Sequence, residues 1–116
     1  MKLHKLKSPN ITDEMISEII KKIINNFNPE KIILFGSRVW GTPEDWSDID
    51  LLVIMDYKGV SPKITAQISQ IARPPYIPID IIVRSPQEIQ YRKKIGDYFI
   101  NRILNQGKVL YERKVS

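Results

Sequence analysis

Cysteine is absent from this chain, and histidine occurs only once, as His4 close to the N-terminus. Disulfide bonds, thiolate metal sites and histidine-based zinc chemistry are therefore excluded. Long hydrophobic runs are also missing, because none approaches the roughly 18 residues that a membrane-spanning helix needs. The first residues lack the apolar stretch of a secretory signal peptide. We therefore expect a cytoplasmic protein without membrane association.

The chain has the size and composition of one globular domain. Its 116 residues can form a single hydrophobic core but leave no room for a second, substrate-binding domain. Hydrophobic residues make up 42% and charged residues 27%, as in ordinary globular proteins. We expect one domain over residues 1–116. The net charge of +5 suits polyphosphate, nucleic acid or an acidic protein surface without choosing among them, so direct nucleic-acid binding stays open.

Hydrophobic periodicity and turn residues predict an alternation of helices and strands. The expected elements are a helix from Thr12 to Asn28, strands over 31–35 and 48–55, a helix capped by Ser61 and ending before Pro74, a strand over 77–83, one long helix from the Ser85–Glu88 capping box to about Asn105 with Gly107 as its C-terminal cap, and a strand over 108–113. This order predicts a small α/β (α+β) fold, in which a mixed β-sheet carries its helices on one face. It does not predict the order of the strands.

A Gly-Ser pair follows the first strand and is a candidate phosphate-binding turn. Gly36 can adopt a positive φ and lets a ligand approach the backbone closely. Ser37 adds a hydroxyl and an N–H group, and a helical turn beginning at Ser37 or Arg38 would offer free N–H groups to a nucleoside triphosphate. Arg38 would add positive charge. An ordinary strand-ending turn is the simpler explanation of this pair taken alone.

Three aspartates form the second candidate element of the site. Asp48 and Asp50 alternate in a strand, so their side chains share a face, and Asp80 interrupts a later apolar strand. A solvent-facing polar stripe is the simpler explanation, but Asp is disfavoured in strands, and an isolated carboxylate in a buried strand is costly. If the two strands are neighbours, the three carboxylates converge and need a counter-ion. Two magnesium ions would supply it.

Gly36-Ser37, ten intervening residues, Asp48-Ile49-Asp50 and a later Asp80 together resemble the nucleotidyltransferase superfamily of DNA polymerase β. Over nearly its full length the chain looks like a minimal nucleotidyltransferase (MNT) domain, the antitoxin partner of HEPN-domain toxins. By this resemblance, Gly36 and Ser37 would hold the triphosphate. Asp48 and Asp50 would bind metal, and Asp80 would complete the metal site and act as a base. The resemblance implies a polymerase β-like fold.

The activity expected from these residues is transfer of AMP from ATP to a hydroxyl group, with magnesium as cofactor. The resemblance suggests that the acceptor is a tyrosine of a cognate HEPN toxin, with which the chain would form a hetero-oligomer. A non-catalytic antitoxin that neutralises its toxin by binding alone is the alternative. A small-molecule nucleotidyltransferase acting on an antibiotic is less favoured, because such enzymes usually need an extra domain to hold the acceptor.

Overall fold

The computed structural model describes residues 11–41 and 48–114. Its elements follow the order α1 (Asp13–Phe27), β1 (Lys31–Phe35), α2 (Ser37–Trp40), β2 (Ile49–Ile54), α3 (Ser61–Ala72), β3 (Ile79–Arg84), α4 (Pro86–Lys94), α5 (Tyr98–Gln106) and β4 (Lys108–Glu112). In this part of the chain no helix is long and apolar enough to cross a membrane. The sequence also predicts a turn at Thr42–Asp45, and these residues lie outside the described part of the chain.

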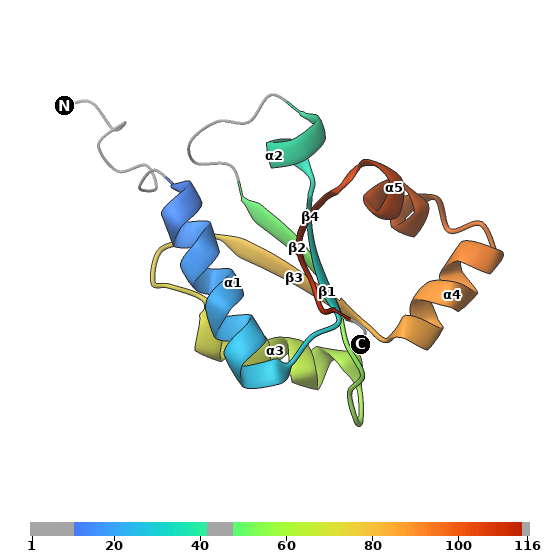
Figure 1. The fold of residues 1–116 in the computed structure, drawn as a ribbon, viewed down its shortest axis with the longest axis horizontal. Coiled ribbons are helices and arrows are strands. Elements are labelled where there is room, and N and C mark those ends of the chain that lie inside the picture. The colour runs from blue at the N-terminus through green and yellow to red at the C-terminus, as the bar shows by residue number, and fades with distance from the viewer. Residues whose placement is uncertain (1–10, 42–47, 115–116) are drawn as a thin grey trace.

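The four strands form one mixed sheet in the order β3-β2-β1-β4 (Figure 1). β1 pairs antiparallel with both β2 and β4, whereas β2 and β3 are parallel and joined through α3. The predicted small α/β fold with a mixed sheet is confirmed. The strand order, which the sequence did not predict, makes β2 and β3 neighbours.

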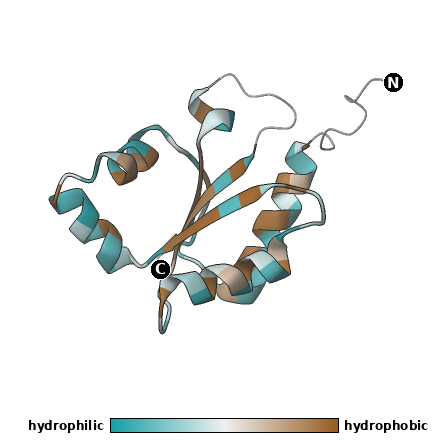
Figure 2. Cartoon of the chain, turned by 180° about the vertical axis from the view of Figure 1, so that it is seen from behind, coloured by the Kyte–Doolittle hydropathy of each residue, from teal (hydrophilic) through white to brown (hydrophobic). Residues whose placement is uncertain are grey.

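Helices cover both faces of the sheet, so the expectation of helices on one face was wrong (Figure 1). Ile32 and Leu34 of β1 pack with α1 and α3, while Ile33 and Phe35 pack with residues of α4 and α5. The physical reason is that β1 and β2 are apolar on both faces, and each face must be covered by a helical layer. Figure 2 shows these strands as the most hydrophobic segments and α4 as largely hydrophilic.

α1 follows its sequence signals closely. Thr12 caps the helix, accepting a hydrogen bond from the Met15 N–H at 3.2 Å, and Asn28 ends it in the left-handed conformation. A stripe of isoleucines, Ile16, Ile19, Ile20 and Ile23, is buried against the sheet. α3 differs in one detail, because Val60 occupies the N-cap position and Ser61 is the first helical residue. The Ser61 hydroxyl instead donates to the Val83 carbonyl at 3.0 Å.

The long C-terminal helix expected from the capping box at Ser85 is in fact two helices. The box itself is present, with the Glu88 N–H donating to the Ser85 hydroxyl at 3.1 Å. Gly96 then takes a φ of +75° and ends α4, with its N–H donating to the Lys93 carbonyl. The Asp97 N–H reaches back to the Arg92 carbonyl, which completes a Schellman motif. The Asp97 side chain then caps α5 by accepting from the Ile100 N–H at 3.0 Å.

This break predicts the effect of two substitutions at Asp97. Asp97→Ala removes the α5 cap and the contact with Arg92, 3.5 Å away, and should lower the free energy of unfolding by about 1 kcal/mol. Asp97→Asn keeps a capping oxygen and loses only a part-exposed ion pair, so it should cost no more than a few tenths of a kcal/mol. Urea unfolding of both variants checks this. Equal losses would mean that the cap does not hold the break in place.

Candidate active site

β2 and β3 bring Asp50 and Asp80 side by side. The two strands are parallel, and their register sets the Asp50 Cα directly opposite the Asp80 Cα. Leu52 and Ile82, each two residues further along its strand, pack in the layer of α4 and α5. Residues two apart in a strand lie on the same face, so Asp50 and Asp80 share that face of the sheet. Asp48 lies one residue before β2. The hypothesis that the strands carrying the carboxylates are neighbours is thereby confirmed.

Gly36 closes the other side of this group. It follows Phe35, which stands opposite Asp50 in the antiparallel register of β1 and β2. Its φ is +85°, and a Cβ added to it would overlap the Asp50 carboxylate. Two independent constraints therefore require glycine here: the positive φ, and the direct approach of the backbone to Asp50. The Gly-Ser turn and the aspartates, which are separate in the sequence, form one constellation.

The short helix α2 begins at Ser37, directly after Gly36. The N–H groups of Val39 and Trp40 donate to the Gly36 carbonyl at 2.9 and 3.1 Å, which fixes the turn. The first N–H groups of a helix have no acceptor within it, so the start of α2 can offer hydrogen-bond donors to a phosphate. The Arg38 side chain bonds within the protein: its guanidinium donates to the carbonyl of Ile11, just before α1, at 3.2 Å.

The three carboxylates differ in their exposure to water. Asp48 and Asp80 are exposed, and Asp50 is partly buried. β3 is an edge strand of the sheet, so Asp80 does not sit in a buried strand, contrary to the reasoning from its apolar sequence neighbours. The desolvation argument therefore holds for Asp50 alone.

Asp50 is the electrostatic centre of the group. Burial raises its pKa, and the charges of Asp80 and Asp48 add to the rise, together with a hydrogen bond to Asp80, so that its pKa is about 6. A carboxyl between two other carboxylates holds a proton more tightly because its ionised form is repelled by both. Below about pH 6, the proton on Asp50 relieves the local excess of negative charge, which a bound cation could neutralise at higher pH.

The donor chemistry of this group fits a hard divalent cation. Its side chains offer only carboxylate oxygens, the ligands that magnesium prefers. Within the described residues no three His, Cys, Asp or Glu side chains already converge as a metal site, and the close pair is Asp50 with Asp80. Binding a cation would therefore require the Asp48 carboxylate to draw in towards this pair.

An aromatic group borders the site and was not foreseen as a unit. The Trp40 ring lies 6.1 Å from the Phe35 ring, and the Phe99 ring meets Phe35 edge-on at 5.5 Å. The Arg102 guanidinium carbon lies 4.2 Å from the centre of the Trp40 ring. Sequence spacing gives no signal for these contacts, because they join α2 and β1 to α5, which is remote in the chain.

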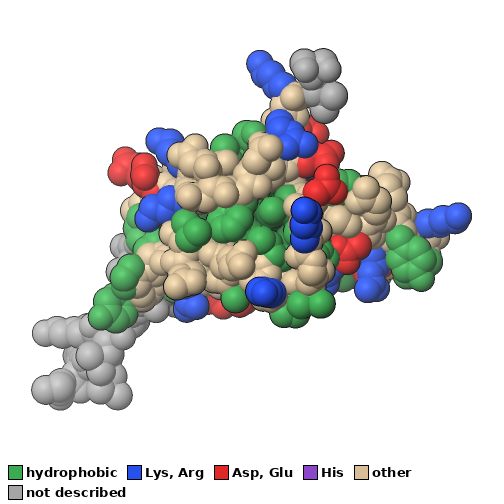
Figure 3. Space-filling view, turned by 90° about the horizontal axis from the view of Figure 1, so that it is seen from below, with side chains coloured by type: hydrophobic (Ala, Val, Ile, Leu, Met, Phe, Trp, Pro, Cys, Tyr) green, Lys and Arg blue, Asp and Glu red, His purple; other side chains and the backbone are tan. Residues whose placement is uncertain are grey.

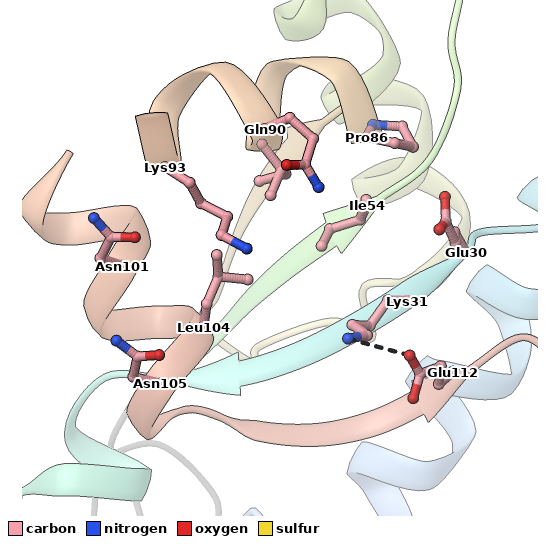
Figure 4. Close-up of a pocket in the computed structure, with 11 residues that line it drawn as sticks. Glu30, Lys31, Ile54, Pro86, Gln90, Lys93, Asn101, Leu104, Asn105 and Glu112 are labelled. Atoms are coloured by element: carbon pink, nitrogen blue, oxygen red, sulfur yellow. Dashed lines mark ion pairs between the residues drawn. The ribbon is translucent and has the colours of Figure 1, made fainter. Parts of the chain in front are cut away.

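A cavity found among the described residues lies away from the carboxylates (Figure 4). It measures about 370 Å³ and lies between α4, α5 and the sheet, beside Ile54 at the far end of β2 from Asp50. Lys93 points into it, and Lys31 at its edge is paired with Glu112 at 3.2 Å. The candidate site lies instead at the opposite end of β2, where Gly36, Asp50 and Asp80 come together.

Comparison with known proteins decides the family. The family model for polymerase β nucleotidyltransferases matches residues 17–116. The chain belongs to this family. A "putative protein adenylyltransferase" of Methanocaldococcus jannaschii is 31% identical over 103 residues, which span 85% of this chain and 97% of that protein. The protein is therefore a nucleotidyltransferase, as its Gly-Ser and Asp-x-Asp motifs predicted.

Two solved structures share the fold of this nucleotidyltransferase. A "putative nucleotidyltransferase" from Sulfolobus solfataricus superposes with a TM-score of 0.62 at 22% identity, over 86% of this chain and 79% of that one. Spectinomycin adenyltransferase from Enterococcus faecialis, solved with ATP and spectinomycin, superposes with a TM-score of 0.57 at 16% identity. The latter match covers 90% of this chain but only 58% of that enzyme.

The raised pKa of Asp50 predicts a pH-dependent effect of Asp50→Asn. A carboxyl whose pKa is higher in the folded than in the unfolded protein makes stability fall as the pH rises from about 4 to about 6. Removing it should therefore raise the free energy of unfolding at pH 7 by about 1 kcal/mol, allowing for solvent screening, and change little at pH 4.

Urea unfolding with EDTA present, at pH 4 and pH 7, measures this difference. Asp56→Asn, at an exposed position beyond the other end of β2, is the matched control. A loss of stability in Asp50→Asn at pH 7 would contradict the repulsion described for this site.

Proposed function

We propose that this nucleotidyltransferase transfers AMP from ATP to a hydroxyl group in a magnesium-dependent reaction that releases pyrophosphate. One observation carries the proposal: Asp50 and Asp80 lie opposite each other on parallel strands, against the Gly36 turn. Attack on the α-phosphorus needs positioning and charge neutralisation rather than a covalent enzyme intermediate. A carboxylate group beside a turn with free N–H groups provides both.

Each residue of the constellation has a role in this scheme. Asp48, Asp50 and Asp80 would hold two magnesium ions, which neutralise phosphate charge and lower the pKa of the attacking hydroxyl. Gly36 and the backbone of Ser37 would bind the β- and γ-phosphates. Asp80, exposed at the sheet edge, would take the hydroxyl proton as the new P–O bond forms and the bond from the α-phosphorus to the bridging oxygen breaks.

The choice of ATP and of a protein acceptor is supported by the relatives. The Methanocaldococcus jannaschii protein carries the name "putative protein adenylyltransferase", and the Enterococcus enzyme was solved with ATP. Together with the resemblance to MNT domains, this supports a tyrosine of a cognate HEPN toxin as the acceptor, and an antitoxin role for this chain. Asp48 and Asp80 are exposed, so that a folded protein could approach them.

On the one face that Figure 3 shows, the charge distribution agrees with a protein partner better than with a long nucleic acid. On the face seen from below in Figure 3, the described Lys and Arg side chains are dispersed among acidic, apolar and neutral ones. Nucleic-acid binding usually draws on a continuous basic stripe. The net positive charge of this chain would steer the approach of the partner, without one basic patch that holds it.

Co-expression with the protein encoded beside this one tests the proposal. After incubation with ATP and magnesium, intact-mass measurement of the purified partner should show additions of whole AMP groups. Asp48→Asn and Asp50→Asn should abolish the additions, since removing a metal ligand costs several kcal/mol at the transition state. Both variants should melt at or above the temperature of the unaltered protein, which separates loss of chemistry from loss of folding.

Two further results bear on this scheme. EDTA should stop the additions in the unaltered protein. A partner that is fully neutralised yet unmodified, with ATP and magnesium in excess, would contradict adenylylation and favour an antitoxin that acts by binding alone.

A further inference from the structure

A basic side chain from α5 lies directly against α2, the helix that starts at the Gly-Ser turn. The guanidinium of Arg102 stacks on the ring of Trp40, the last residue of α2, at 4.2 Å from its centre. The Arg102 Nε also donates to the Gln106 side-chain oxygen at 3.2 Å. These two contacts hold the guanidinium in one place beside α2.

This guanidinium is on the same side of the sheet as the aspartates. Trp40 packs against Phe35, and both belong to the hydrophobic layer between the sheet and α4 and α5. Phe35 in turn stands opposite Asp50 in the β1 and β2 register. The two ring contacts of Trp40 and the strand register therefore place Arg102 on the face that carries Asp50.

Arg102 has donor capacity that its protein contacts do not use. A guanidinium carries five N–H donors in a rigid fork, and its Nε makes the bond to Gln106. The ion pairs found among residues 11–41 and 48–114 are Lys21–Glu18, Lys31–Glu112 and Arg92–Asp97, so Arg102 neutralises no described carboxylate. Stacking on an aromatic ring leaves the edge of the fork available to an anion.

α5 is held firmly enough to make this placement a property of the fold. Ile100 and Ile103 are buried against the sheet, and Asp97 caps the helix start. At the helix end, a Cβ on Gly107 would lie 2.6 Å from the Ile33 Cγ2 and 3.1 Å from the Leu34 carbonyl oxygen. Only glycine allows the chain to approach β1 so closely, and this contact fixes how α5 lies over the sheet.

We propose that Arg102 binds the β- and γ-phosphates of the nucleoside triphosphate, as the cationic partner of the Gly36-Ser37 turn. The inference rests on the proposed function, because it assumes that the triphosphate extends from the aspartates towards α2. A planar guanidinium can bind two phosphate oxygens at once. This assigns to α5 the positive charge that the sequence placed on Arg38, whose guanidinium bonds to the Ile11 carbonyl.

The competing explanation is that Arg102 only clamps Trp40 onto the sheet. If Arg102 only holds Trp40 in place, its loss should lower the stability and the binding of every nucleotide by the same factor. If Arg102 binds phosphate, its loss should weaken the binding of ligands with β- and γ-phosphates more than that of AMP. The two explanations therefore separate when ligands with and without the β- and γ-phosphates are compared on the same variants.

The experiment measures binding of three probes with magnesium present: a non-hydrolysable ATP analogue by calorimetry, and AMP and pyrophosphate by competition. Arg102→Gln should lower the affinity for the ATP analogue and for pyrophosphate about tenfold or more, as expected for one lost charge-assisted hydrogen bond. Its affinity for AMP should change less than twofold. Arg102→Lys should keep part of the affinity. Arg92→Gln, on α4 and paired with Asp97, is the matched control and should bind all three probes normally.

Unchanged binding of the ATP analogue in Arg102→Gln, or an equal loss for AMP, would overturn the inference and leave the proposed function standing. Failure of the unaltered protein to bind the ATP analogue with magnesium would overturn both. Thermal melting of Arg102→Gln is measured alongside, and a variant that has unfolded is replaced by Arg102→Lys in the same comparison.

Discussion

The parallel pairing of β2 with β3 is the constraint on which the site depends. It sets Asp50 opposite Asp80, and the antiparallel pairing of β1 with β2 sets Gly36 against Asp50 from the other side. A shift of either pairing by one residue would turn an aspartate to the opposite face, into the layer of α1 and α3. The buried isoleucines of that layer, such as Ile49 and Ile79, make such a shift costly. The hydrophobic core therefore fixes the register of the carboxylates.

The same arrangement places a cost on the folded protein. Asp50 is held partly buried beside two like charges, which raises its pKa to about 6, so near neutral pH its ionised form opposes folding. Natural proteins retain such groups mainly where function needs them. Gly36 adds a second departure from a stable local structure, since its φ of +85° and its contact with Asp50 exclude every side chain. Two unfavourable features at one point favour a functional over a structural role.

Local sequence signals predicted the bounds of most helices and strands well, whereas the arrangement of the helices around the sheet was predicted poorly. The spans of α1 and β1 followed from isoleucine periodicity and from the stop at Asn28-Pro29. The Gly96-Asp97 break was missed, although a glycine followed by a capping aspartate is a stop and start signal in the sequence itself. The second helical layer could also have been predicted from the sequence. A run that is apolar at every position, such as Ile32–Phe35, is buried on both faces and needs a helical layer on each.

The candidate site was predicted as a list of residues but not as a geometry. Asp48, Asp50 and Asp80 were tied together by the hypothesis that their strands are neighbours, which the sheet order confirms. The contact of Arg102 with Trp40 could not be predicted, because it depends on how α5 crosses the sheet and leaves no pattern in the spacing of the two residues. Exposure at Asp80 depended in the same way on strand order, which makes β3 an edge strand.

Paramagnetic relaxation by manganese tests most directly whether these aspartates form a cation site. Mn²⁺ replaces magnesium at carboxylate sites and broadens the NMR signals of nearby amides. The account predicts that substoichiometric Mn²⁺ in the presence of a non-hydrolysable ATP analogue broadens the amides of Gly36, Asp50 and Asp80 first, and leaves those of Ile54 and Glu112, at the other end of the sheet, sharp. Broadening centred on the Ile54 end, or spread evenly over the chain, would contradict it.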